Sequence, residues 1–398
     1  MLTTEPATNA LAERIAAAIR SRAPVARRYF AENATAIAEA ARNVAQRLND
    51  GGSIYAFGRG AYATDAQHVA VEFVHPVLVG KRALPASDVS LSFEAALPVI
   101  AGPHDVVLGF GPPEGDPAIA RALEAARVRG AYTFALPGGV ADFAMTAASD
   151  DEHVHQEIAE ILGHVLYESV HVFLEHRQLD HDAGASSFLY PFLGGPAQSP
   201  GDLAGDVAAS IVAKSIEAQE LRERVAAEES VAIAAAATSI AKEVAAGGRL
   251  LLFGNGGSAT DATDWAIDCV SPPAGLAPIP ALSLAAEPAT ITAIANDVGR
   301  EVIFLRQLIA HVRPRDVVIA LSTSGGSQNV IAALEEARKR GNRTVALLGY
   351  DGGQILRKGL ADHTIVVRSD YIPRIQEAQA TIYHTLRHAI DWVTRDGA

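Results

Sequence analysis

Two turns rich in glycine and serine carry the clearest chemical signal in this sequence. One is Gly254-Asn255-Gly256-Gly257-Ser258, and the other, 322–327, reads Ser-Thr-Ser-Gly-Gly-Ser. Glycines let the backbone approach a ligand closely, and the N–H groups at a helix start favour an anion. Neither turn has the lysine of a Walker loop or the spacing of a dinucleotide fingerprint. The pair of turns predicts a phosphate site; the alternative is a capped turn that only starts a helix.

A second set of residues could hold a metal and move protons. His68 and Glu72 have the i, i+4 spacing that places two side chains on one face of a helix. Gln156 and His164 lie eight residues apart, just over two helical turns, and also share a face. Two imidazoles, a carboxylate and an amide oxygen suit zinc better than magnesium. Taken alone, however, an i, i+4 His/Glu pair is more often a surface pair.

Both sets belong to an internal repeat. The segment SIYAFGRGAYATDAQHVAVEF, 53–73, matches RLLLFGNGGSATDATDWAIDC, 249–269, at an offset of 196 residues. Downstream, DVVLGFG matches DVVIALS, and HQEIAEILGH matches IQEAQATIYH. Repeated segments of this length predict two copies of one structural unit.

Each copy shows the same order of expected elements. Ala-rich helical stretches come first (8–48 and 204–246), and a long helix closes each copy (153–177 and 373–395). Between them lie short apolar runs, at 53–58, 105–110 and 131–136, then at 249–254, 316–321, 343–348 and 363–368. Apolar runs that alternate with helices indicate an α/β fold with a buried parallel sheet.

The expected domains follow the repeat. We predict a first domain over 1–185, a linker over 186–202 that is rich in Gly, Pro and Ser, and a second domain over 203–398. The length of 398 residues suits two cores better than one. The formal net charge of −13 argues against nucleic acid or an anionic membrane as partner. A single cysteine, no signal-peptide pattern and no long apolar run favour a cytoplasmic protein.

At these motifs the chain resembles the sugar isomerase (SIS) superfamily, and within it the phosphoheptose isomerases. The resemblance rests on GNGGSATDA, STSGGSQNVIAAL, Ala295–Gly299, Gly352-Gly353 and Arg374–Glu377. It implies two tandem doubly wound domains, each with three α/β/α layers and framed by long helices. It also implies a sugar-phosphate site, with phosphate bound by Ser322, Thr323, Ser324 and Ser327, with Asn255 and Ser258 lining the sugar, and with Asp297 and Gln376 as further substrate-binding residues.

The resemblance also assigns roles in the first copy. A His-x₃-Glu and a Gln-x₇-His form a zinc (Zn²⁺) and acid–base set in the family, and the first copy retains all four as His68, Glu72, Gln156 and His164. The second-copy equivalents are Asp264, Asp268, Gln376 and His384, so two of the four ligands differ. Conversely, 109–116 of the first copy lacks the hydroxyls of the phosphate loop and carries two prolines and two carboxylates.

These complementary losses predict one composite site that combines the phosphate loop of the second copy with the quartet of the first. The expected reaction is aldose–ketose isomerisation through an enediol, most simply between sedoheptulose 7-phosphate and a manno-heptose 7-phosphate. Glu72 and His164 are the expected proton-transfer pair, with the metal polarising the carbonyl.

Some features leave alternatives open. The family's arginine shortly after the catalytic glutamate is missing in both copies, so a different sugar phosphate is credible. A non-catalytic sugar-phosphate sensor or scaffold, or a phosphosugar deaminase or lyase, are the rival functions. The resemblance further implies a homodimer of tandem chains that mimics a tetramer of SIS domains.

Overall fold

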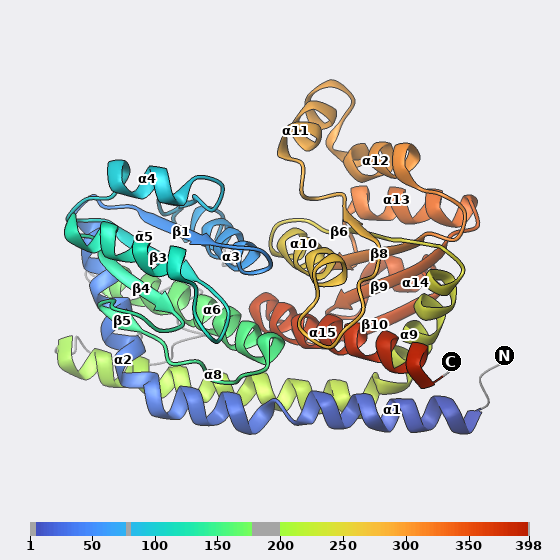
Figure 1. Ribbon diagram of the computed structural model, residues 1–398, viewed down its shortest axis with the longest axis horizontal. Coiled ribbons are helices and arrows are strands. Elements are labelled where there is room, and N and C mark those ends of the chain that lie inside the picture. Colours follow the sequence, from blue (N-terminus) through green and yellow to red (C-terminus); the bar gives the residue numbers. More distant parts are fainter. Residues whose placement is uncertain (1–4, 77–80, 177–199, 397–398) are drawn as a thin grey trace. The chain divides into compact units, whose positions relative to one another are not determined.

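The computed structural model describes residues 5–76, 81–176 and 200–396, which belong to two compact units (Figure 1). The first-sheet unit consists of Pro24–Gln219, and the second-sheet unit consists of Met1–Ala23 together with Glu220–Ala398. Each unit contains one five-stranded sheet, and all strand pairs are parallel.

The first-sheet unit has the strand order β2-β1-β3-β4-β5. Its elements in chain order are α2 (Ala23–Asn49), β1 (Ile54–Gly58), α3 (Tyr62–Val74), β2 (Ala86–Asp88), α4 (Phe93–Ile100), β3 (Val106–Phe110), α5 (Pro117–Val128), β4 (Tyr132–Leu136), β5 (Phe143–Ala144) and α6 (Glu152–His176).

The second-sheet unit has the equivalent order, β10-β9-β8-β6-β7. Its elements in chain order are α9 (Ser230–Ala245), β6 (Leu250–Phe253), α10 (Gly257–Val270), β7 (Ala281–Ser283), α11 (Pro288–Asp297), the 3₁₀ helix η2 (Arg300–Val302), α12 (Ile303–His311), β8 (Val317–Ser322), α13 (Gln328–Lys339), β9 (Arg343–Gly349), α14 (Gly353–Arg357), β10 (His363–Val367) and α15 (Ile372–Asp396).

Both sheets are covered on both faces, which makes each unit a three-layer sandwich. Side chains of a strand alternate between faces, and β8 shows this clearly. Val317, Ile319 and Leu321 join a core with α9, α10 and α15, whereas Val318 and Ala320 join a core with α12 and α13. In the first-sheet unit, Val106 and Leu108 of β3 likewise face α2, α3 and α6, while Val107 faces α4 and α5. The expected doubly wound α/β fold is confirmed.

The first helix of each copy belongs to the unit built on the other copy's sheet. Helix α1 (Glu5–Arg20) buries Ile15 and Ile19 in the core of the second-sheet unit. Helix α8 (Pro200–Glu228) starts in the first-sheet unit, where Val207 and Ile211 are buried in the core. The buried Lys214 of α8 also forms an ion pair with Glu168 of α6.

This exchange makes the compact units differ from the predicted domains, 1–185 and 203–398. The sequence repeat marks where each copy begins, but α1 and the first part of α8 pack within the opposite unit. Of the predicted linker, residues 186–199 lie outside the described part of the chain, and 200–202 form the start of α8.

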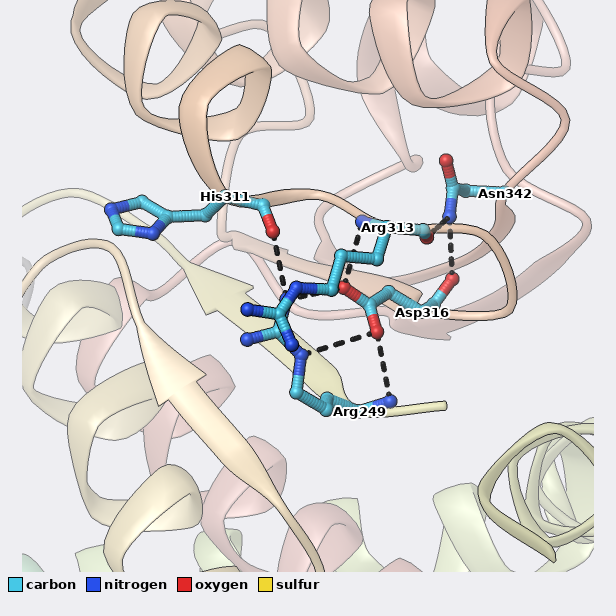
Figure 2. A network of polar contacts seen from close by, with 5 residues as sticks. All are labelled: Arg249, His311, Arg313, Asp316 and Asn342. Atoms are coloured by element: carbon cyan, nitrogen blue, oxygen red, sulfur yellow. Dashed lines mark hydrogen bonds and ion pairs between the residues drawn. The ribbon is translucent and has the colours of Figure 1, made fainter. Parts of the chain in front are cut away.

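The repeated Asp-Val-Val motif has a structural role at the amino ends of the strands. Asp316, which precedes β8, accepts hydrogen bonds from the backbone N–H of Arg249 at 3.0 Å and of Arg313 at 2.9 Å, and pairs with the Arg249 guanidinium at 2.7 Å (Figure 2). Asp105 in the first-sheet unit accepts in the same way from Ser53 and Gly102. The motif therefore links neighbouring strands at their amino ends, and the glycine-rich turns lie at the carboxyl ends.

Candidate functional site

The phosphate loop of the second-sheet unit connects β8 to α13 at the carboxyl end of the sheet. Ser322 is the last residue of β8, and its buried Oγ accepts a hydrogen bond from the Gly325 N–H at 3.1 Å. Ser327 is the N-cap residue of α13, yet within the described chain its side chain makes no capping hydrogen bond. Ser324 is exposed. The hydroxyls at 324 and 327 and the start of α13 thus offer donors to an anion.

Glycines are required where this loop packs against the turn before α14. Gly325 has a φ of 58°, and a Cβ there would lie 2.2 Å from the carbonyl oxygen of Gly352. The amide of Ile355 donates to the carbonyl of Gly325 at 2.9 Å, which holds the two segments together. Gly352 and Gly353 also have positive φ angles, of 83° and 57°. The Gly352-Gly353 pair therefore allows the turn before α14 to pack closely against the backbone of the phosphate loop.

The other glycine-rich turn lies beside this loop. Gly254 follows β6, and a Cβ on it would lie 2.4 Å from the carbonyl oxygen of Ser258, so the turn needs glycine there. The side-chain amides of Asn255 and Asn329 donate to each other at 3.0 and 2.9 Å, which links the two turns. Ser258 is buried in the first turn of α10.

Strand topology makes the gap between these turns a natural binding position. Strands β6 and β8 are neighbours, and β7 lies on the far side of β6. The connection after β6 therefore leads to β7 on one side of the sheet, and the connection after β8 leads to β9 on the other side. In open α/β sheets, ligands bind at this point, beyond the carboxyl ends of the strands.

Two further predicted substrate residues are placed differently. Asp297 ends α11, is exposed, and accepts a hydrogen bond from the Asn296 amide at 2.7 Å. Gln376 is buried on α15, and its Oε1 has no hydrogen-bond partner among the described residues. The structure describes no hydrogen bond from either side chain to the phosphate loop, so their roles in substrate binding stay predictions.

In the first-sheet unit, the predicted metal set is partly assembled. His68 lies on α3 and His164 on α6, and their Nε2 atoms are 3.2 Å apart. Glu72 Oε1 lies 4.0 Å from His68 Nε2, and Glu72 Oε2 is buried with no hydrogen-bond partner among the described residues. All three side chains are buried, and they line one small pocket whose open space is about the size of a water molecule or an ion.

The fourth predicted ligand, Gln156, makes a hydrogen bond to Asp65, which lines the same pocket. Its Nε2 donates to Asp65 Oδ2 at 3.2 Å. Glu160, which was not predicted, instead has a carboxylate oxygen within 4.8 Å of ligand nitrogens of both His68 and His164. The sequence did contain a signal for it, because Glu160 and His164 have the same i, i+4 spacing as His68 and Glu72.

These residues fit a zinc ion. Two nitrogens bound to one tetrahedral zinc at the usual bond length are about 3.3 Å apart, close to the observed 3.2 Å between His68 and His164. The nearby carboxylates can supply anionic ligands, and the buried Glu72 Oε2 has no partner in the described ranges, so an ion or a substrate proton could provide one. The donor set is typical of zinc rather than of magnesium.

The equivalent residues of the second copy form a carboxylate-rich group. Asp264 accepts a hydrogen bond from the Tyr383 hydroxyl at 2.7 Å. His384 Nε2 lies 3.5 Å from Asp264 Oδ2 and 3.4 Å from Asp268 Oδ2. Among these equivalent residues His384 is the one histidine, whereas the first-copy set has two.

No helix in the described part of the chain is long and apolar enough to span a membrane.

The sequence is similar to a protein-family model and to curated proteins of known name. A family model described as "SIS domain" matches residues 19–96 and 216–349, together more than half of the chain. A phosphoheptose isomerase of Pelodictyon phaeoclathratiforme is 44% identical over 184 residues, which cover 44% of this chain and 83% of that protein.

Two solved structures are similar over nearly the whole chain. The C-terminal domain of glucosamine-fructose-6-phosphate aminotransferase from Francisella tularensis has a TM-score of 0.59 and 9% identity, covering 95% of this chain and 96% of its own. Tagatose-6-phosphate ketose/aldose isomerase from Escherichia coli has a TM-score of 0.57 and 16% identity, covering 96% of this chain and 92% of its own. At such identities the likeness concerns the tandem fold alone.

Proposed function

We propose that this chain, which belongs to the SIS domain family and is an isomerase, interconverts the ketose and aldose forms of a sugar phosphate. The favoured pair is sedoheptulose 7-phosphate and D-glycero-D-manno-heptose 7-phosphate. A phosphoheptose isomerase is 44% identical to this chain over a region that covers 83% of that relative. The observation that carries the proposal is the buried group of His68, His164 and Glu72, in which a carboxylate lies next to two imidazoles.

The phosphate loop supplies binding and orientation. Its hydroxyls and the start of α13 are suited to hold the phosphate of the substrate, far from the reacting carbons. Binding energy from such a remote group can be used to orient the reacting end of the sugar. The Asn255–Asn329 pair fixes the neighbouring turn, which we propose contacts sugar hydroxyls.

Glu72 and His164 supply the proton transfer in this proposal. The Glu72 carboxylate takes a proton from the carbon next to the carbonyl, and the enediol forms. The proton returns to the neighbouring carbon, while His164 exchanges a proton with the substrate oxygen. Both side chains are buried, so their electrostatic interactions with the substrate are stronger than they would be in water.

His68, His164 and a carboxylate from Glu72 or Glu160 would hold the metal, for which we propose zinc. Zinc at such a site polarises a carbonyl and stabilises the negative charge of an enediolate oxygen. Gln156 is proposed as a further ligand through its amide oxygen, while its nitrogen donates to Asp65 and would orient it.

We propose further that catalysis needs residues of both copies. The second copy keeps the phosphate loop, and the first copy keeps the two-histidine group. Neither copy alone retains both sets. We also propose that the chain works as a homodimer, as the family resemblance implies.

The test is turnover of ketose phosphates with five to eight carbons, followed by NMR in D₂O. We expect sedoheptulose 7-phosphate to give an aldose product that carries deuterium at carbon 2, because an enediol can exchange its proton with solvent. Binding of the ketose phosphates without turnover of any of them would contradict the proposal and indicate a sugar-phosphate sensor instead.

A further inference from the structure

The turn after β3 in the first-sheet unit ends at Asp116, whose carboxylate accepts hydrogen bonds from the start of α5 and from Arg59. Asp116 is the N-cap residue of α5, and it stands at the position that Ser327 has before α13. Its Oδ1 accepts from the backbone N–H of Ala118 at 2.6 Å and of Ile119 at 3.3 Å. These are the N–H groups that an anion at the start of this helix would use.

The same carboxylate also has a cationic partner. Arg59 Nη1 donates to Asp116 Oδ2 at 3.0 Å. Arg59 lies in the turn after β1, at the position that Asn255 has after β6 in the repeat. Burial alone would raise the pKa of Asp116, but the two backbone N–H groups and Arg59 together lower it. The carboxylate is therefore held as an anion by the kind of donors that bind phosphate.

In the second copy, the turn after β6 and the start of α13 are joined by uncharged side chains. There, Asn255 pairs with Asn329 through two amide hydrogen bonds, and Ser327 makes no capping bond within the described chain. The Val330 N–H of α13 donates to Asn329 Oδ1 at 2.9 Å, and the Ser327 hydroxyl is the donor that the second copy offers a ligand at this position. In the first copy, Pro112 and Pro113 additionally lack the N–H groups that Thr323 and Ser324 offer.

We propose that Asp116, held by Arg59 and the start of α5, is an internal substitute for phosphate that closes the first copy to sugar phosphates and limits the chain to one phosphate. The inference rests on the proposed function of the second-copy loop. It makes Asp116 the residue that determines which copy receives the substrate.

The test counts the inorganic phosphate bound per chain by isothermal titration, for the full-length chain and for three variants. Asp116→Ser gives the first copy the residue of the second copy, and serine remains a good N-cap, so α5 is preserved. Glu114→Gln removes the same charge from the same turn without touching the cap. The double variant Arg59→Asn with Asp116→Ser removes the cation as well. Circular dichroism confirms that each variant is folded.

We expect one phosphate per chain for the unaltered protein and for Glu114→Gln, two for Asp116→Ser, and one for the double variant. Two phosphates on the unaltered chain, or an unchanged count in Asp116→Ser, would overturn the inference. A gain in Glu114→Gln equal to that in Asp116→Ser would also overturn it, because net charge would then be the cause.

A failure of the proposed function would look different. If the unaltered chain binds no phosphate and Asp116→Ser binds one, the second-copy loop is not a phosphate site, but Asp116 does close the first copy. If neither binds phosphate, both ideas are wrong.

Discussion

At the scale of single residues, the most informative comparison is between His155 and its counterpart Ile375. Both occupy the same position in the closing helix of their copy. His155 is fully buried, and its Nε2 lies 3.2 Å from the carbonyl oxygen of Gly111. Burial lowers the pKa of His155 to about 4, although the hydrogen bond to Gly111 opposes this shift. The second copy avoids the cost of burying a titratable group by using isoleucine.

This difference predicts how stability depends on pH. The folded pKa of His155, about 4, lies below the ordinary value of 6.5. The unfolded chain therefore binds the extra proton between these values, and stability falls as the pH drops from about 6.5 to about 4. We expect His155→Ile to flatten the loss of Tm over this range, as measured by thermal unfolding at a series of pH values. His171, whose pKa burial also lowers to about 4, should still contribute a slope in the variant.

An equally steep loss of Tm in His155→Ile and in the unaltered chain would show that other groups set the acid sensitivity.

Sequence spacing predicted which side chains lie close together better than it predicted their individual hydrogen-bond partners. The spacing of His68 with Glu72 and of Gln156 with His164 predicted shared helix faces, and the structure brings His68, Glu72 and His164 together. It could not show that the Gln156 amide turns to Asp65, or that Glu160 approaches the histidines. Those facts depend on side-chain rotamers and on how α3 and α6 cross, which no spacing encodes.

At the scale of elements, the predicted strands and helices agree closely with the structure where they are apolar and long. The closing helices, expected at 153–177 and 373–395, are α6 at 152–176 and α15 at 372–396. The short edge strands β2, β5 and β7 were not predicted. They have only two or three residues each and pair on one side, so they carry no continuous apolar run that a sequence pattern could reveal.

The phosphate loop provides a test at this scale, because two glycines in the two turns share a positive φ angle but have different surroundings. Gly325 and Gly256 have nearly equal positive φ angles, 58° and 57°. A Cβ at 325 would meet the carbonyl of Gly352 at 2.2 Å, whereas a Cβ at 256 would meet nothing within 4 Å. Alanine at 256 should therefore add only the backbone cost of holding a non-glycine residue at φ 57° and ψ −128°, about 1–3 kcal/mol.

We expect Gly325→Ala to weaken phosphate binding at least tenfold, because the loop must shift to avoid Gly352. Gly256→Ala should change phosphate affinity much less, since no clash is created. Titration calorimetry of both variants measures this, with Tm as a check on folding. Equal losses in the two variants would mean that backbone conformation, and not the contact with Gly352, shapes the loop.

At the scale of the whole chain, the repeat predicted two α/β units but not the exchange of their first helices. An internal repeat shows which segments are equivalent, but it does not determine which unit a helix packs in. Ile15 in α1 and Ile211 in α8 are equivalent in the repeat, yet each is buried in the core of the unit built on the other copy's sheet. Both have nearly zero exposure, 0% and 1%.

This pair of residues provides a reciprocal test of the exchange. Truncating a buried isoleucine to alanine costs about 2–5 kcal/mol. We expect Ile15→Ala to speed amide hydrogen exchange in β6, β8 and α9, and Ile211→Ala to speed it in β1, β3 and α6. Mass spectrometry after exchange resolves these segments. If Ile15→Ala loosened the first sheet and Ile211→Ala the second, each first helix would instead serve its own copy.

The central claim, that one isomerase activity depends on residues of both copies, is tested most directly by the kinetics of four variants. The substrate is sedoheptulose 7-phosphate, and the variants are Glu72→Gln and His68→Ala in the first copy, and Ser324→Ala and Asp268→Asn in the second. We expect Glu72→Gln to lower kcat about 10²–10⁴-fold, as for loss of a general base. His68→Ala should lose both activity and bound zinc.

Ser324→Ala should lower kcat/KM by about tenfold or more, as for loss of one hydrogen bond to a charged group. Asp268→Asn, the second-copy counterpart of Glu72, should retain kcat within a few-fold. Full activity in either His68→Ala or Ser324→Ala would contradict the account, as would an Asp268→Asn variant that is inactive while Glu72→Gln is not.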